Sequence, residues 1–300
     1  MMKKYDVAAY VWPAYTGDDM RARLFWGEGY GEWQTVNNVK RNSAGKPKNY
    51  VWDRRPLWGY VNEANPDVME MQINCAYKHG VNVFIYDWYW YDGRPFLENC
   101  LNDGYLKATN NDLVRFYIMW ANHNATHVWS IDHSDEFTDE VIWRGDVSFD
   151  TFKTIVKRWI EKYFSHPSYY KIDGKPVLSI YSITNFLKSF GGFEGAKEAI
   201  AYFREEVKRA GLPGLNIQNF LFRQLMGRRL GDVEYGEQEE LKQSATYPEA
   251  DTATEWLLLD KNAAGDEGIS DAQAEARQMA QRIRQLMAEM TVSEGDATRP

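Results

Sequence analysis

Strand-like and helix-like segments alternate along most of the chain. Short apolar runs rich in β-branched and aromatic residues predict five strands, at residues 7–12, 81–87, 113–120, 177–181 and 215–219. Helical spacing between them predicts helices over residues 66–79, 149–164 and 195–209. Asn65 is expected to cap the first helix, with Pro66 in its first turn and Gly80 at its end. This alternation predicts a parallel sheet with right-handed crossovers.

The pattern weakens toward the C-terminus. Residues 231–255 are polar and acidic, and at most a sixth strand is expected near residues 241–247. Residues 271–290 show the apolar stripe of an amphipathic helix. We therefore expect one barrel-like domain over residues 1–250, followed by a polar C-terminal segment, 251–300, that carries this helix.

The predicted fold class is α/β, of the (β/α)8 TIM-barrel type. Six strands cannot close an eight-stranded barrel, so the barrel is expected to be incomplete or irregular in its C-terminal part. An open edge exposes backbone and apolar faces. The helix at 271–290 is therefore expected to cover the edge or to pair with another subunit; the alternative is an ordinary final barrel helix.

Composition excludes several classes of function. The 300 residues carry 35 basic and 43 acidic side chains, a net charge of -8, without a Lys/Arg-rich run. Nucleic-acid affinity depends on neutralising phosphates, so no nucleic-acid partner is expected. No stretch approaches the ~20 apolar residues of a membrane span. The chain as given is expected to be cytoplasmic, or exported if a leader was removed. Cys75 and Cys100 are expected to stay reduced.

Aromatic content is high, with 12 Trp, 19 Tyr and 14 Phe, and it concentrates where the predicted strands end. The clusters lie at residues 26–33, 86–92 and 120–129. Ligand sites of parallel α/β folds form at the C-terminal ends of strands. Trp and Tyr stack on sugar rings, and polar neighbours bind hydroxyls. We therefore expect a carbohydrate site on one concave face. Its candidate binding residues are Tyr10, Trp12, Trp26, Glu28, Trp33, Trp88, Tyr89, Trp120, Asn122 and His123.

Each cluster also has a structural interpretation. For Glu28 and Glu32 the structural interpretation is a pair of solvated carboxylates in a loop, and the functional one is a pair of side chains that bind a sugar. Asp87 ends an apolar run, where an unpaired carboxylate is costly, and Arg94 would be its structural partner.

No metal or cofactor is expected. His123 and His127 have the i, i+4 spacing of a metal pair, but Asn124 stands where a zinc-protease motif needs Glu, and no third ligand is obvious. The chain has no Walker loop, no Rossmann glycine fingerprint and no serine nucleophile elbow.

Four segments together carry a resemblance to a known family. They are Tyr10-Val-Trp-Pro13, Trp26-Gly-Glu-Gly-Tyr-Gly-Glu-Trp33, residues 80–90 and Trp120-Ala-Asn-His123, in that order. The set resembles glycoside hydrolase family 99 and its relatives found in polysaccharide-biosynthesis loci. The resemblance covers residues 5–185 well and 186–250 faintly. It implies a (β/α)8 barrel and an activity toward α-mannosides, with cleavage that retains configuration.

One family motif is missing. The resemblance implies catalytic carboxylates in a Glu-Trp-x-Glu-Gly motif near the end of the barrel, but the only Glu-Trp pairs here are Glu32-Trp33 and Glu255-Trp256, and neither continues into the motif. The family's catalytic pair is therefore carried over to no residue of this chain. Glycoside cleavage needs two carboxyl groups, and Glu32 and Asp87 are the best available pair. The missing strands predict weak or absent hydrolysis.

The predicted function is that of a glycoside hydrolase acting on an oligosaccharide or polysaccharide. One alternative is a carbohydrate-binding protein without catalysis. Another is glycosyl transfer in surface-polysaccharide synthesis, although no Asp-x-Asp triplet follows a predicted strand.

Overall fold

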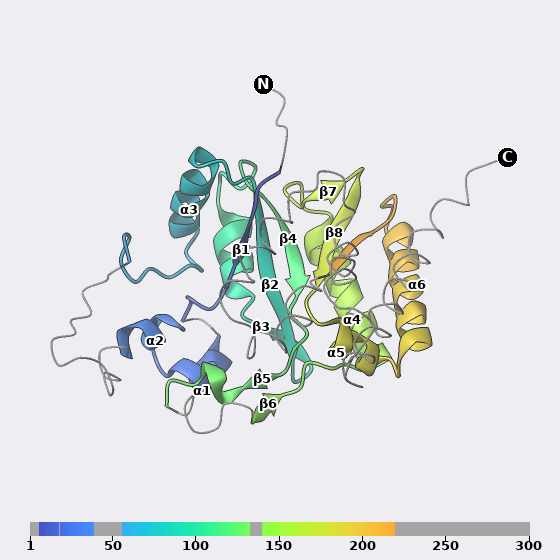
Figure 1. Cartoon of the computed structure of the whole chain (residues 1–300). Helices are drawn as coiled ribbons and strands as arrows, with labels where there is room; N and C mark the ends of the chain where they lie inside the picture. Colours follow the sequence, from blue (N-terminus) through green and yellow to red (C-terminus); the bar gives the residue numbers. More distant parts are fainter. Residues whose placement is uncertain (1–5, 18, 39–55, 133–139, 220–300) are drawn as a thin grey trace, which may run out of the picture.

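The computed structural model describes residues 6–17, 19–38, 56–132 and 140–219, and its centre is a parallel sheet (Figure 1). Five strands lie side by side in chain order: β1 (Ala8–Val11), β2 (Val83–Tyr91), β4 (Arg115–Trp120), β8 (Lys175–Ile180) and β9 (Asn216–Asn219). They are the five strands expected from the sequence. The main difference is β2, which continues to Tyr91, past the predicted end at Asp87.

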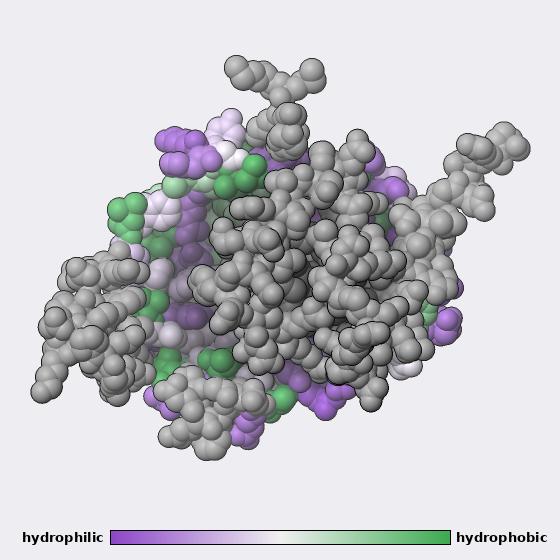
Figure 2. Space-filling view, in the orientation of Figure 1, coloured by the Kyte–Doolittle hydropathy of each residue, from purple (hydrophilic) through white to green (hydrophobic). Residues whose placement is uncertain are grey.

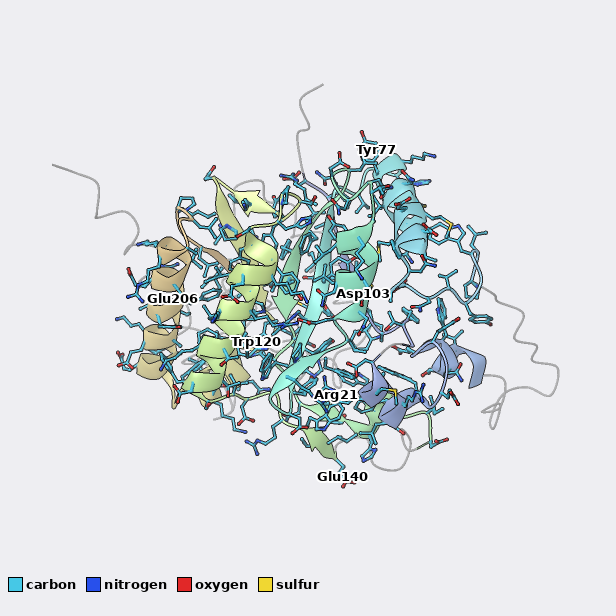
Figure 3. All side chains as sticks on the ribbon, turned by 180° about the vertical axis from the view of Figure 1, so that it is seen from behind. Arg21, Tyr77, Asp103, Trp120, Glu140 and Glu206 are labelled. Carbon is cyan, nitrogen blue, oxygen red and sulfur yellow. The ribbon has the colours of Figure 1, made fainter. Side chains whose placement is uncertain are left out.

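Helical segments connect the parallel strands across one face of the sheet. They are α3 (Pro66–Lys78), the π-helical turn η2 (Cys100–Gly104), the 3-10 turn η3 (Tyr105–Lys107), α4 (Phe149–Trp159), the π-helical turn η5 (Ile160–Phe164), α5 (Ile183–Ser189) and α6 (Phe193–Arg209). Seen from behind, α4 lies in front of the sheet, with α3 and α6 toward its two sides (Figure 3). Successive parallel strands that are neighbours in the sheet have the winding of a (β/α) barrel. Among the described residues β1 and β9 remain separate edges, so this part of the chain forms an open sheet, as expected for a barrel that is incomplete or irregular in its C-terminal part.

Local sequence explains the helix boundaries. The Asn65 side chain accepts a hydrogen bond from the Asp67 amide at 2.9 Å, so Asn65 caps α3 as predicted. Ser148 caps α4 in the same way, with the Thr151 amide 3.2 Å from its hydroxyl. The buried stripe of α4 faces the sheet, and its π-helical continuation η5 completes the helix predicted over 149–164.

Smaller elements gather at the carboxyl ends of β1 and β2. They are η1 (Met20–Ala22), α1 (Arg23–Trp26), α2 (Trp33–Asn38), β3 (Arg94–Phe96), β5 (Ala125–Thr126), η4 (His127–Trp129) and β6 (Val141–Trp143). Figure 1 shows α1, β5 and β6 beyond the lower end of the sheet. At the other end β7 (Lys171–Ile172) forms a hairpin with β8. The sequence pattern did not predict these elements.

The apolar interior has two parts. The larger fills the space between the sheet and the helices and includes Phe116, Trp120 and Trp159. The smaller lies at the carboxyl ends of the strands and is mostly aromatic, with Phe25, Tyr89 and other rings. Cys75 and Cys100 are free thiols, as predicted.

Several expectations concern residues outside the described part of the chain. These are the sixth strand at 241–247, the domain boundary at 250, the Glu255-Trp256 pair and the helix at 271–290. Within the described residues no helix is long and apolar enough to cross a bilayer. On the described surface visible in Figure 2, hydrophobic patches are small and interspersed with hydrophilic ones.

Candidate functional site

The candidate site lies on the face of the sheet opposite the helices, which we call the inner face. Side chains alternate along a strand, and Trp88 of β2 contacts α4, so its neighbours Asp87 and Tyr89 belong to the inner face. Strand register aligns Asp87 with Met119, and through it with Ser179 and Gln218. One carboxylate and two polar side chains thus share a row across four strands.

Asp87 is close to several tyrosine hydroxyls. The Tyr89 hydroxyl donates to Asp87 Oδ2 at 3.4 Å. The pKa values of Tyr10, Tyr89 and Tyr91 are raised, first by burial and secondly by the negative charge of Asp87. These hydroxyls therefore remain protonated and able to donate near neutral pH.

Glu32 is tied to the same group through Trp12. The Trp12 indole N–H donates to Glu32 Oε2, and the Trp12 ring meets Tyr89 edge-on with centroids 5.6 Å apart. Burial raises the pKa of Glu32, and the hydrogen bond from Trp12 partly opposes this. A contact path therefore runs from Glu32 through Trp12 and Tyr89 to Asp87, so two aromatic side chains connect the two predicted catalytic carboxylates; we call these four residues the carboxylate cluster.

The glycine-rich motif explains how Glu32 reaches the end of β1. Gly31 has φ +58°, and a Cβ there would lie 1.8 Å from the Ala14 carbonyl oxygen. Glycine is therefore required for the close approach. The Glu32 amide then donates to the same oxygen at 3.0 Å, which anchors the motif beside the strand end.

Aromatic rings surround this end of the inner face. The His123 ring lies 5.7 Å from Tyr89, 5.6 Å from Trp129 and 5.2 Å from Tyr181, measured between centroids. Trp26 is almost fully buried and stacks on Trp129 at 6.4 Å. The structure thus places Tyr10, Trp12 and Tyr89 beside one or other carboxylate, His123 against Tyr89, and Trp26 one ring farther away, against Trp129.

Two predicted binding residues lie on the other face of the sheet. Trp88 is 2% exposed, and its indole N–H donates to Glu98 at 2.7 Å. Trp120 is 1% exposed and packs on Trp159 of α4 at 5.6 Å; Figure 3 labels it beside that helix. The structure does not bring these two side chains together with Asp87, because residues at odd and even positions of a strand point to opposite faces. Both serve the core.

Asn122 is a buried connector. Its side chain donates to the Ser182 carbonyl at 2.8 Å and accepts from the Ser182 amide at 2.7 Å. Its own carbonyl accepts from the Asn185 side chain at 2.9 Å. Asn122 therefore joins the end of β4 to the start of α5 and supports its neighbour His123.

The remaining predicted residues, Glu28 and Trp33, belong to the same glycine-rich motif as Glu32. Glu28 is exposed and pairs with Arg23 at 3.8 Å. The Trp33 indole donates to a main-chain carbonyl at 2.8 Å, and its ring lies 4.3 Å from Tyr15. Burial, with smaller contributions from Glu32 and Glu63, raises the pKa of Tyr15 to about 12. Trp33 therefore belongs to the surroundings of Glu32.

Sequence reasoning missed several inner-face residues. Tyr117, Ser179, Gln218, Tyr181 and Trp129 were not predicted, although the Tyr117 hydroxyl donates to Gln218 at 3.2 Å across two strands. The alternation of side chains within each predicted strand, counted from Asp87, would have identified the first three.

The described residues contain no group of three or more His, Cys, Asp or Glu side chains arranged to hold a metal ion. Two surface hollows of about 510 and 540 Å3 lie elsewhere, one beside α3 and one between α4 and α6. None of the predicted site residues lines either of them.

With this geometry in place, comparison with known proteins gives the family. The profile of the family described as glycosyltransferase WbsX matches residues 8–293, so the chain belongs to that family. The membership confirms the expected resemblance to the family 99-like proteins of polysaccharide loci. It also defines the chain as a member of a carbohydrate-active family.

Individual relatives match only in part. The uncharacterized protein WxcX of Xanthomonas campestris pv. campestris is 25% identical over 158 residues, 52% of this chain and 21% of that protein. An 80-residue segment is 49% identical to an ATP-dependent helicase/nuclease subunit of Bacillus licheniformis, 25% of this chain and 6% of that protein. The chain thus spans a small part of each. A GH99 endo-α-mannosidase structure from Bacteroides thetaiotaomicron is similar at 17% identity and TM-score 0.31, covering 61% of this chain and 45% of that one.

Proposed function

We propose that the inner face binds a glycan and cleaves a glycosidic bond, with an α-mannoside as the first substrate to test. The observation that supports this most directly is the contact path from Glu32 through Trp12 and Tyr89 to Asp87. Two carboxylates, protonated tyrosine hydroxyls and the Trp12 indole lie along this path, near the carboxyl ends of β1 and β2. Sugar-active sites combine these groups.

The two carboxylates have different roles in this proposal. Burial raises the pKa of Glu32, so its carboxyl group stays protonated at higher pH than usual and suits the general acid. Asp87 acts as the base or nucleophile, and Tyr89 holds it by a hydrogen bond. Turnover is expected to be weak, because the family's Glu-Trp-x-Glu-Gly motif is absent from this sequence.

The test measures turnover of α-mannan and of a panel of neutral polysaccharides. Turnover is monitored through the release of reducing ends. Glu32→Gln and Asp87→Asn are each expected to lower kcat by about 10²–10⁴-fold. Glu28→Gln is the matched control, because Glu28 is exposed and pairs with Arg23 away from the carboxylate cluster. Unchanged turnover in both site variants would exclude this pair.

A pH profile separates the two roles. A protonated Glu32 predicts that kcat falls as pH rises through the raised pKa of this group. Glu32→Gln should remove that limb from any residual activity.

Glycosyl transfer is the second candidate, and the description of the WbsX family favours it. Transfer to an added acceptor sugar, scored in the same panel as a lengthened product, distinguishes it from hydrolysis. Binding without either product would indicate a carbohydrate-binding protein. The 80-residue similarity to a helicase/nuclease subunit covers too little of that protein to support a proposal about nucleic acid.

A further inference from the structure

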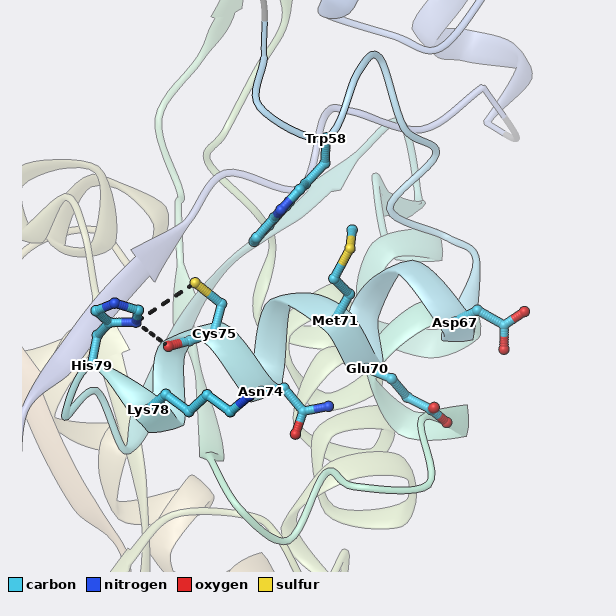
Figure 4. A pocket seen from close by; sticks show the side chains of 8 residues that line it. All are labelled: Trp58, Asp67, Glu70, Met71, Asn74, Cys75, Lys78 and His79. Carbon is cyan, nitrogen blue, oxygen red and sulfur yellow. Dashed lines mark hydrogen bonds between the residues drawn. The ribbon is translucent and has the colours of Figure 1, made fainter.

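A hollow on the outer side of α3 is lined by residues that the proposed site does not use. Its volume is about 510 Å3, within the range of roughly 300–1,000 Å3 typical of small-molecule sites. The described residues that line it are Trp58, Asp67, Glu70, Met71, Asn74, Cys75, Lys78 and His79. Figure 4 shows Trp58 above the helix, with the Met71 and Cys75 side chains pointing toward its ring.

Trp58 is held in place by a local turn. The Gly59 amide donates to the Pro56 carbonyl at 3.0 Å, and Gly59 takes φ +76°. The turn leaves Trp58 39% exposed at the hollow. A large flat ring that is fixed at its backbone and partly accessible is a platform for an apolar ligand face.

The rim of the hollow carries both donors and acceptors. Asp67 and Glu70 come from the first half of α3, and Lys78 and His79 from its last turn and end. Thr109 donates to Glu70 from its amide at 2.9 Å and from its hydroxyl at 2.7 Å, which fixes the carboxylate. His79 Nδ1 lies 2.8 Å from the Cys75 carbonyl oxygen, so the ring donates there and Nε2 is the nitrogen that can face a ligand.

This chemistry selects one class of ligand. Charges of both signs around the hollow favour neither an anion nor a cation. An indole platform with mixed donors and acceptors fits a neutral ring that has an apolar face and a girdle of hydroxyls. A pyranose has this form.

We propose that the α3 hollow, defined by the eight residues above, is an auxiliary binding site for one sugar unit of a neutral polysaccharide. This proposal rests on the proposed function, because it assumes that the chain acts on a glycan. The hollow lies on the helix side of the sheet and Asp87 lies on the inner face, so the sugar bound here is not the one that reacts. Two sites on one polymer raise its apparent affinity without any new contact at the reacting centre.

The experiment measures retardation of the full chain in native gels that contain α-mannan or other neutral polysaccharides. Trp58→Ala is expected to weaken retardation by at least about tenfold, because the second contact with the polymer is lost. Trp58→Phe should keep part of it. Leu57→Ala is the matched control, since Leu57 is adjacent, 93% exposed and outside the hollow. Melting curves verify that each variant is folded. If Trp58→Ala is unfolded, Asn74→Ala tests the rim of the hollow in its place.

The outcomes separate this site from the proposed active site. Trp58→Ala should cleave a short soluble oligosaccharide at the wild-type rate, whereas Asp87→Asn should lose that cleavage. Loss of retardation in Trp58→Ala supports the auxiliary site even if no variant cleaves anything. Wild-type retardation of folded Trp58 variants, or a wild type that no polysaccharide retards, overturns it.

Discussion

Glu98 is a buried carboxylate whose charge is fully compensated. It is 8% exposed and accepts hydrogen bonds from Trp88 Nε1 at 2.7 Å, Tyr163 at 2.8 Å and Arg158 Nε at 2.9 Å. Burial alone would raise the pKa of Glu98, but the hydrogen bonds and charge of Arg158 outweigh this, so the pKa is lowered. The ionised form is therefore the one that stabilises the fold.

Glu63 is equally buried, at 9% exposed, but its partners are neutral. Gln72 donates to it at 2.7 Å, and the Cys100 thiol lies 3.8 Å away. No ion pair of Glu63 occurs among the described residues. Burial raises the pKa of Glu63, and the hydrogen bonds from Gln72 and Cys100 only partly oppose this. The protonated form is therefore the one that suits the fold.

Substitution by glutamine should have opposite effects at the two sites. At pH 8, Glu98→Gln is expected to lower the free energy of unfolding by about 3 kcal/mol, the low end for a broken buried pair, because the Arg158 side chain is 31% exposed and regains water. Glu63→Gln is expected to raise it, because glutamine replaces a carboxylate whose charged form is disfavoured by burial at this pH.

The pH dependence follows from the direction of each pKa. A raised pKa means that the folded state binds more protons between the two values, so the stability contributed by Glu63 is lost as pH rises through its folded pKa. The gain from Glu63→Gln should therefore vanish near pH 4. A lowered pKa means that the contribution of Glu98 is present above the usual pKa of glutamate and lost as pH falls through its folded pKa.

Urea unfolding at pH 4, 6 and 8, followed by circular dichroism, measures both effects. A Glu63→Gln variant less stable than wild type at pH 8, or a Glu98→Gln cost that stays the same at all three pH values, would refute the reasoning.

Three further substitutions test other parts of the fold by thermal or urea unfolding. Asn122→Ala should cost about 2 kcal/mol, since it removes the acceptor of the Ser182 amide and one of the donors to the Ser182 carbonyl; Asn122→Asp, which keeps the acceptor, should cost less. Arg21→Ala should cost about 2 kcal/mol, because Arg21 donates to the Tyr91 carbonyl at 3.1 Å and covers two aromatic rings; Arg21→Lys should recover only part. Trp129→Ala should cost about 3–5 kcal/mol, because rings from several elements pack against it at the carboxyl end of the sheet; a cost below about 1 kcal/mol would argue against a packed cluster there.

The sheet was predictable because burial on both faces leaves a direct trace in the sequence. Apolar β-branched runs identified all five parallel strands, and capping residues such as Asn65 and Gly80 marked the first helix. The short hairpins were missed, although their turns have a clear composition. Asp92-Gly93 and Asp173-Gly174 both take positive φ and close two-residue hairpins, which is the known preference of Asp-Gly.

The candidate site was predictable in part. Its position at the carboxyl ends of the strands follows from the fold class, and the structure places the motif around Glu32 beside the end of β1. The error in grouping Trp88 and Trp120 with Asp87 came from assigning each aromatic cluster as a whole to the site, and from ending the second strand at residue 87. They continue β2, so their side chains alternate between the inner face and the helices, and composition cannot reveal that alternation until the strand end is known.

The position of Glu32 and Asp87 matters for the proposed glycoside cleavage, because the family's Glu-Trp-x-Glu-Gly motif is absent from this sequence. Glu32 follows β1 and Asp87 lies in β2, and these strands are direct neighbours in the sheet. Their contact path through Trp12 and Tyr89 uses no residue beyond β2. The arrangement therefore does not depend on how the barrel continues after β9, whereas the family motif belongs to the later strands. The proposed binding and proton transfer therefore rest on Glu32 and Asp87 and need no residue of the family motif.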